Sequence, residues 1–177
     1  INGVPLVNQN TDYATTPWAC VKDNITGLIW EVKTNDEGLH DKDDRYNWYS
    51  TDPTTNGGHV GYPDDDGNIC YGYNASTSST YCNTQAYVVR VNSAGWCGAN
   101  DWRLPTREEL KSIVSYDRYN PAIDINYFPN TISSEYWSGS PTVNYSNDSW
   151  YIHFQHGLSN AYPGNYDDYV RLVRGGK

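Results

Sequence analysis

The chain has 177 residues, a formal net charge of −9 and a mean hydropathy of −0.77. This length suits one domain with a sizeable core, so we predict a single domain over residues 1–177. The acidic balance argues against nucleic acid and anionic membranes as partners, and no apolar run is long enough for membrane insertion.

Residues 18–32 have the pattern of a β-hairpin. Two runs suited to strands, residues 20–23 and 28–32, flank a turn that contains Asn24 and Gly27. Residues 33–81 follow and are rich in Gly, Asn, Asp, Ser and Thr, with little periodicity. We interpret them as a long, ordered loop insertion, which in a compact domain is usually functional or linker-like.

The long loop contains a candidate calcium site. Asp64, Asp66 and Asn68 offer hard oxygen ligands around Gly67, which suits Ca²⁺, although the remaining EF-hand pattern is missing. The alternative is that these are solvated turn residues, since turns use the same residue types. A bound ion would order the loop as a structural Ca²⁺, and no cofactor is otherwise required.

A first helix is predicted over residues 83–94. Asn83 or Thr84 supplies the N-terminal cap, apolar side chains gather near one face, and Gly95 provides the C-terminal stop. At about 1.5 Å per residue this helix spans roughly 18 Å.

Four cysteines indicate two disulfide bonds and an extracellular location. Buried or metal-binding thiols are the alternative, but zinc spacing such as C-x-x-C is missing. Bridged Cα atoms must lie within about 7 Å, so the first helix makes a Cys82–Cys97 bond unlikely. Two pairing patterns remain. We prefer Cys70–Cys82, which closes a short loop, together with Cys20–Cys97.

A second helix begins in the phrase DWRLPTREEL, residues 101–110. Thr106 occupies the N-cap position, Glu109 completes a capping box, and Pro105 stiffens the approach to the helix. The helix is expected to extend to about Tyr116.

Three short strands are predicted in the last third of the chain, at residues 136–138, 150–154 and 169–173. A leading hairpin, two helices and these later strands give an α+β domain. We expect two helices packed on short antiparallel sheets, with long ordered loops and disulfide staples. Alternation divides the middle strand into two faces: Trp150, Ile152 and Phe154 on one, and Tyr151, His153 and Gln155 on the other.

Three phrases together resemble the Lcl C-terminal domain family of bacterial surface proteins, formerly a domain of unknown function. They are TGLIWE (26–31), DWRLPTREEL (101–110) and YVRLVRGG (169–176). The resemblance implies a C-type lectin-like fold, in which N- and C-terminal strands pair to close the domain. It also implies a secreted or cell-surface location in a bacterium, and a scaffold for binding rather than for chemistry.

We predict that the protein is not an enzyme. No G-x-S-x-G element accompanies the four histidines. The phrase RLPT-x-x-E, residues 103–109, also resembles formylglycine-generating enzymes, which share this broad fold and use cysteines near the C-terminal end of the domain. No cysteine follows Cys97 here. A degenerate enzyme of that type is therefore the weakest of the alternatives.

The candidate ligand-binding loops lie within residues 135–168, which are rich in Tyr, Trp, Ser, Asn and Gly. Aromatic rings give large contacts at low entropic cost, and small polar residues adapt their hydrogen bonds. The alternative is that the aromatic rings only pack. No Lys or Arg lies between Arg118 and Arg171, which argues against a heparin-like ligand. The predicted ligand-binding residues are Tyr145, Asn147, Trp150, Tyr151, His153, Gln155, His156, Asn160, Tyr162, Asn165 and Tyr166.

The sequence thus predicts an extracellular adhesion module that recognises a glycan or a host or partner surface protein. The alternative is a pilin-like or other assembly subunit that binds further copies of itself or a larger parent surface protein. Arg103, Arg171 and Arg174 are expected to make internal ion pairs or backbone contacts, outside the binding surface.

Overall fold

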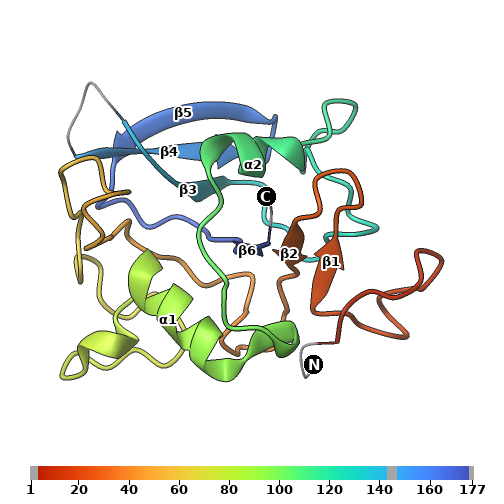
Figure 1. The fold of residues 1–177 in the computed structure, drawn as a ribbon, viewed down its shortest axis with the longest axis horizontal. Coiled ribbons are helices and arrows are strands. Elements are labelled where there is room, and N and C mark those ends of the chain that lie inside the picture. Colours follow the sequence, from red (N-terminus) through yellow and green to blue (C-terminus); the bar gives the residue numbers. More distant parts are fainter. Residues whose placement is uncertain (1–3, 143–146, 176–177) are drawn as a thin grey trace.

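Two three-stranded antiparallel sheets form the framework of the molecule (Figure 1). The first sheet has the order β1–β2–β6, with β1 at Cys20–Lys22, β2 at Ile29–Glu31 and β6 at Val173–Arg174. The hairpin is as predicted, and β6 closes antiparallel on β2. The computed structural model describes residues 4–142 and 147–175, and the statements below refer to this part of the chain.

The second sheet has the order β3–β4–β5, with β3 at Glu135–Pro141, β4 at Asp148–His153 and β5 at Leu158–Pro163. Two of these strands match predicted ones, but β5 lies in a stretch predicted to be loop. Its sequence, LSNAYP, mixes apolar and polar residues without the regular alternation that marks a strand, and none of its residues is fully buried. Ladder pairing to β4 along its whole length defines it instead.

The predicted strand at residues 169–173 is wrong for most of its length, because only Val173 belongs to β6. The backbone of this segment divides its hydrogen bonds between the two sheets. Tyr169 exchanges bonds with β3, whereas the carbonyl of Leu172 accepts from Glu31 of β2. The segment therefore links the sheets and does not extend either one.

Helix α1 covers Thr84–Ala94 as predicted, with the Asn83 side chain accepting from the Ala86 N–H and Gly95 in the left-handed conformation at φ 65°. Helix α2 covers Arg107–Ser112, and its capping box is present.

Helix α2 stops before the expected Tyr116, because the next backbone groups bond elsewhere: the Ser115 N–H donates to the Ala122 carbonyl. Two 3-10 turns, at Ser78–Thr80 and Trp96–Gly98, precede and follow α1. None of the described helices combines the length and apolar character needed to cross a bilayer.

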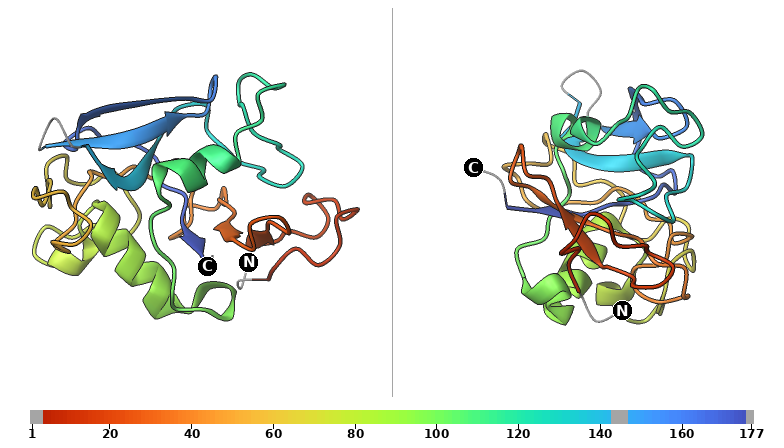
Figure 2. Two further views of the ribbon diagram at one scale, coloured as in Figure 1. Left: turned by 45° about the horizontal axis from the view of Figure 1, so that its top comes forward. Right: turned by 90° about the vertical axis from the view of Figure 1, so that its right-hand side faces the viewer.

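The core has two parts: one packs between the first sheet, α2 and the second sheet, and the other packs between α1, the long loop and the second sheet (Figure 2). One cluster centres on Trp30 and Phe154, and another on Tyr87 and Trp137. The disulfides are Cys20–Cys97 and Cys70–Cys82, the preferred pairing. The fold is therefore α+β with two disulfides, as predicted.

The long loop of residues 33–81 takes part in the core. Its residues Tyr46 and Trp48 are buried in the core, and the Tyr46 backbone pairs with the backbone of Asp168. Near the start of the loop, Lys33 contacts the buried carboxylate of Glu31. Burial alone would raise the pKa of Glu31, but neighbouring groups, with Lys33 foremost, hold it below its ordinary range. The loop is thus fixed by core packing and by buried polar contacts as well as by a disulfide.

Candidate functional site

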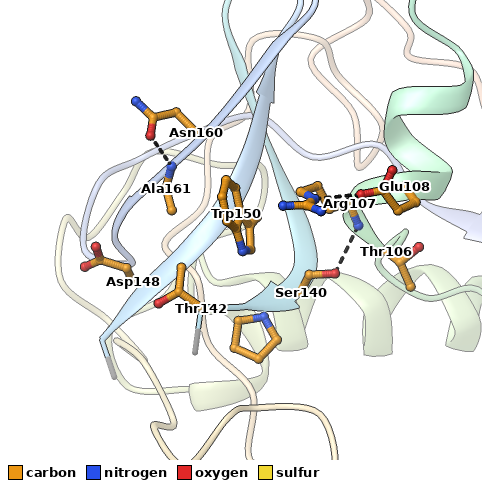
Figure 3. Close-up of a pocket in the computed structure, with 10 residues that line it drawn as sticks. Thr106, Arg107, Glu108, Ser140, Thr142, Asp148, Trp150, Asn160 and Ala161 are labelled. Atoms are coloured by element: carbon orange, nitrogen blue, oxygen red, sulfur yellow. Dashed lines mark hydrogen bonds and ion pairs between the residues drawn. The ribbon is translucent and has the colours of Figure 1, made fainter. Parts of the chain in front are cut away.

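A hollow of about 570 Å³ lies on the second sheet beside the start of α2 (Figure 3). The C-terminal end of β3 and the first turn of α2 form one side of the hollow, and β4 and β5 form the other side. We call it the Trp150 hollow. It is lined by Thr106, Arg107, Glu108, Ser140, Pro141, Thr142, Asp148, Trp150, Asn160 and Ala161.

Among the described residues that line this hollow, Trp150 is the only aromatic one. Its partner across the ladder is Ala161, whose small side chain leaves space above the strand. The Arg107 guanidinium lies 4.4 Å from the centre of the Trp150 ring, a cation–π contact. Arg107 also contacts the Glu108 carboxylate at 2.6 Å. The indole is therefore held by a side chain from the first turn of α2.

The capping arrangement that starts α2 also positions hydroxyl groups at the hollow. The Arg107 N–H donates to Ser140 Oγ at 3.0 Å, which joins the helix start to β3. Thr106 Oγ1 accepts from the Glu109 N–H. Both hydroxyls act as acceptors in these bonds, and neither O–H donates to another described residue, so each can donate to a bound molecule. Asp148 adds a carboxylate acceptor at the opposite side (Figure 3).

Asn160 borders the hollow, but its side chain extends away from Trp150 (Figure 3). Its Oδ1 accepts from the Ala161 N–H at 2.9 Å. Asn160 pairs with Tyr151 across the ladder, so both side chains lie on the face opposite Trp150.

That opposite face is filled by aromatic rings. Tyr151 is 8% exposed, and its ring centre lies 4.4 Å from that of Tyr162. Tyr162 also packs edge-on against Trp137, with Tyr166 on its outer side. The Tyr162 hydroxyl donates to the carboxyl of Asp168, and burial raises the pKa of Asp168 to about 7. We call Trp137, Tyr151, Tyr162 and Tyr166 the aromatic cluster. Trp137 and Tyr151 are buried in the core, whereas Tyr166 is exposed at its edge.

The two predicted histidines lie together at the turn between β4 and β5. The His153 and His156 rings are 4.4 Å apart, and His153 Nε2 is 3.3 Å from a Glu135 carboxylate oxygen. Burial lowers the pKa of His153. Gln155 next to them accepts the Asn120 N–H through its carbonyl.

The predicted binding residues therefore do not form one surface. Trp150 contributes its side chain to the hollow and Asn160 borders it. Tyr151, Tyr162, Tyr166 and the two histidines lie elsewhere. Asn147 is exposed, Asn165 accepts from Asn47 through its carbonyl, and Tyr145 lies outside the described residues.

The sequence assigned no binding role to eight of the lining residues. Ser140, Pro141, Thr142, Asp148 and Ala161 lie inside the predicted stretch 135–168, but small or polar residues there gave no individual signal. Thr106, Arg107 and Glu108 belong to the DWRLPTREEL phrase, which predicts only a helix start. The expected internal roles of three arginines are observed: Arg103 pairs with Glu109, Arg171 donates to the Glu31 carbonyl, and Arg174 pairs with Asp101.

The predicted calcium ligands are engaged in hydrogen bonds within the long loop. Asp64 Oδ2 accepts from the Tyr73 hydroxyl at 3.0 Å, and Asp66 Oδ2 accepts from Asn47 Nδ2 at 2.9 Å. Asp64 Oδ1 is buried and has no hydrogen-bond partner among the described residues. Within residues 4–142 and 147–175, no three His, Cys, Asp or Glu side chains converge as metal ligands would. The residues thus do not form a ready-made metal site, and calcium binding stays a prediction.

The fold and the hollow define a disulfide-bonded α+β domain that presents one tryptophan among hydroxyl and carboxylate groups. The family model described as the Lcl C-terminal domain matches residues 19–174, and the chain belongs to this family. Comparison with curated proteins gave no match. The family points to a surface-associated domain, and the two disulfides fit an extracellular location.

Proposed function

We propose that this domain is an extracellular binding module of a bacterial surface or secreted protein, and that it captures a glycan noncovalently at the Trp150 hollow. The observation that carries the proposal is the position of Trp150 in an open hollow among hydroxyl and carboxylate groups. An indole face packs on the C–H surface of a sugar ring, while hydroxyls and carboxylates match sugar hydroxyls.

The geometry favours a small polar ligand at this point over a large protein surface. The hollow of about 570 Å³ falls within the roughly 300–1,000 Å³ range of small-molecule sites. The hydroxyls of Thr106 and Ser140 offer donors and Asp148 offers acceptors, around one apolar ring. This mixture suits a molecule whose own surface alternates C–H and O–H groups.

The proposal includes a C-type lectin-like fold and no catalytic role. The closure of β6 on β2, the two helices and the two disulfides are compatible with that fold. All four cysteines are paired, so the described chain offers no thiol for chemistry of the formylglycine-generating type.

A second candidate function is self-assembly or binding to a protein of the same surface structure. Three large apolar side chains are exposed near the turn between β4 and β5: Tyr116 at 65%, Tyr119 at 69% and Leu158 at 63%. Tyr116 lies next to Gly157, and the residue after Tyr119 bonds to Gln155, so the three gather at one end of the second sheet. Such a patch is typical of a contact between proteins. A molecular mass that rises with protein concentration in light scattering would support this function, provided that Leu158→Asp removes the rise.

The test of glycan capture is a glycan array probed with three forms of the domain: wild type, Trp150→Ala and Tyr166→Ala. Tyr166 is the matched control, an exposed aromatic residue on the opposite face of the sheet. We expect saturable binding by wild type and Tyr166→Ala, and loss of binding by Trp150→Ala, with both variants still folded at the assay temperature in thermal denaturation. Equal signals from wild type and Trp150→Ala would exclude the hollow as the binding site.

A further inference from the structure

The Trp150 hollow is the first of three hollows that adjoin one another. Thr106 borders both the Trp150 hollow and a second hollow of about 510 Å³ between α1, β3 and the long loop. Tyr49, Gln85 and Val89 border both the second and a third hollow, of about 270 Å³. The three therefore follow one another from the second sheet to α1.

The junction between the first two hollows is held rigidly. The segment that leads from α1 to α2 in Figure 1 lies against β3, where the Gly139 N–H donates to the Pro105 carbonyl at 2.7 Å. A Cβ atom at Gly139 would meet Leu104 at 3.1 Å, so glycine permits this close approach. Thr106 is exposed at this point, as the N-cap of α2.

Helix α1 forms one side of the second hollow with Gln85, Val88 and Val89, which are spaced to share one helix face. Val89 is 51% exposed. The Gln85 side-chain oxygen accepts from Thr51, whereas its amide nitrogen has no partner in the described part of the chain. The second hollow thus combines an apolar surface with a free amide donor. The Trp150 hollow has a similar combination of apolar and polar groups.

The charges along this path disfavour an anionic ligand. The arginines that border it are Arg103 and Arg107, and each is paired with a glutamate, at 2.7 Å and 2.6 Å respectively. The carboxylates of Asp52 and Asp148 also border it and have no cationic partner in the described residues. A sulfated or uronic acid chain would meet these carboxylates without an unpaired cation to bind it.

From these observations we propose that the three hollows form one groove, and that its ligand is an uncharged glycan chain long enough to occupy them together. This deepens the proposed function and rests on it. Each of the first two hollows alone suffices for one small molecule, so a mono- or disaccharide would use only part of the groove. A longer glycan gains contacts with each added sugar unit until it reaches the third hollow near Tyr81.

The test measures affinity against chain length by calorimetry, with neutral β-glucan, xylan, mannan and N-acetylglucosamine oligomers from dimer to octamer. For the series that binds, we expect affinity to rise on the order of tenfold or more from dimer to hexamer and then to level off. The double variant Gln85→Ala with Val89→Ala is expected to remove this gain and to leave dimer affinity unchanged. Trp150→Ala is expected to weaken every length.

The outcomes separate the groove from the proposed function. Dimers that bind as tightly as hexamers, with both weakened by Trp150→Ala, would overturn the groove and leave capture at the Trp150 hollow intact. Heparin oligomers that bind more tightly than every neutral series would overturn the choice of an uncharged chain. Absence of binding by every oligomer, charged or neutral, would overturn both proposals.

Discussion

Trp150 and Tyr151 are neighbours in β4, but their side chains lie on opposite faces of the second sheet and in different surroundings. Trp150 lines an open hollow opposite Ala161, whereas Tyr151 packs against Tyr162 in the aromatic cluster. Both faces use the Tyr, Trp, Asn and Ser residues that are typical of binding loops. The partner strands decide which aromatic residue stays accessible, since small side chains leave room and rings fill it.

The largest expected difference between the two faces is in stability. Trp137→Ala removes a fully buried ring from the aromatic cluster and also the bond from its indole N–H to the Tyr46 carbonyl. We expect the free energy of unfolding to fall by about 3–5 kcal/mol in urea denaturation. Trp150→Ala, from the open face, is expected to lower it by less than about half as much. Equal losses for the two variants would contradict the distinction between a filled and an open face.

The filled face should also make stability depend on pH through Asp168. Burial raises the pKa of Asp168 to about 7 in the folded protein, so the folded state holds a proton that the unfolded chain releases near its ordinary pKa. This contribution to stability is present at low pH and is lost as pH rises through about 7, by up to about 1.4 kcal/mol per unit.

Asp168→Asn is expected to remove this dependence. The measurement is the free energy of unfolding at pH values of about 5 and about 8, in wild type and variant. The variant should lose less stability than wild type between the two. Parallel losses in both proteins would show that the buried carboxyl does not titrate as described.

The smallest expected effect concerns the support of the open face. Arg107→Ala removes the guanidinium that lies on the Trp150 ring, a contact worth about 0.5–1 kcal/mol at an exposed site. Glycan affinity should therefore fall by roughly two- to fivefold in calorimetry. Arg118→Ala is the matched control, since Arg118 forms a comparable surface pair with Asp124 outside the hollow. A similar loss in the control would point to a general effect of charge.

Local signals in the sequence predicted much of the fold. The caps of α1, the capping box of α2 and the hairpin are encoded within a few residues, and the length of α1 argued against a Cys82–Cys97 bond. Strand β5 was missed because its residues show no apolar alternation, and the ladder with β4 defines the strand instead. The end of α2 was misplaced for a similar reason, since distant backbone groups replace its last expected bonds.

The site was less predictable than the fold, because long-range contacts build it. Trp150 was predicted, but the stretch around it contains no cation, and the fold supplies Arg107 from 43 positions earlier in the chain. Tyr151 and Tyr162 were predicted as ligand contacts from the same composition. Their burial depends on Trp137 and Asp168, which the spacing of residues in the sequence does not reveal.

Binding at the open face of the second sheet can be tested most directly by following Trp150 and Trp137, one tryptophan from each face, while a ligand is added. The indole N–H signals of Trp150 and Trp137 can be assigned by NMR from single Trp→Phe variants and followed while a glycan that binds on the array is added. We predict a saturable shift of the Trp150 signal and an unchanged Trp137 signal, because the Trp137 indole is buried and bonded to Tyr46. A shift of Trp137 with no change at Trp150 would contradict the assignment of binding to the open face.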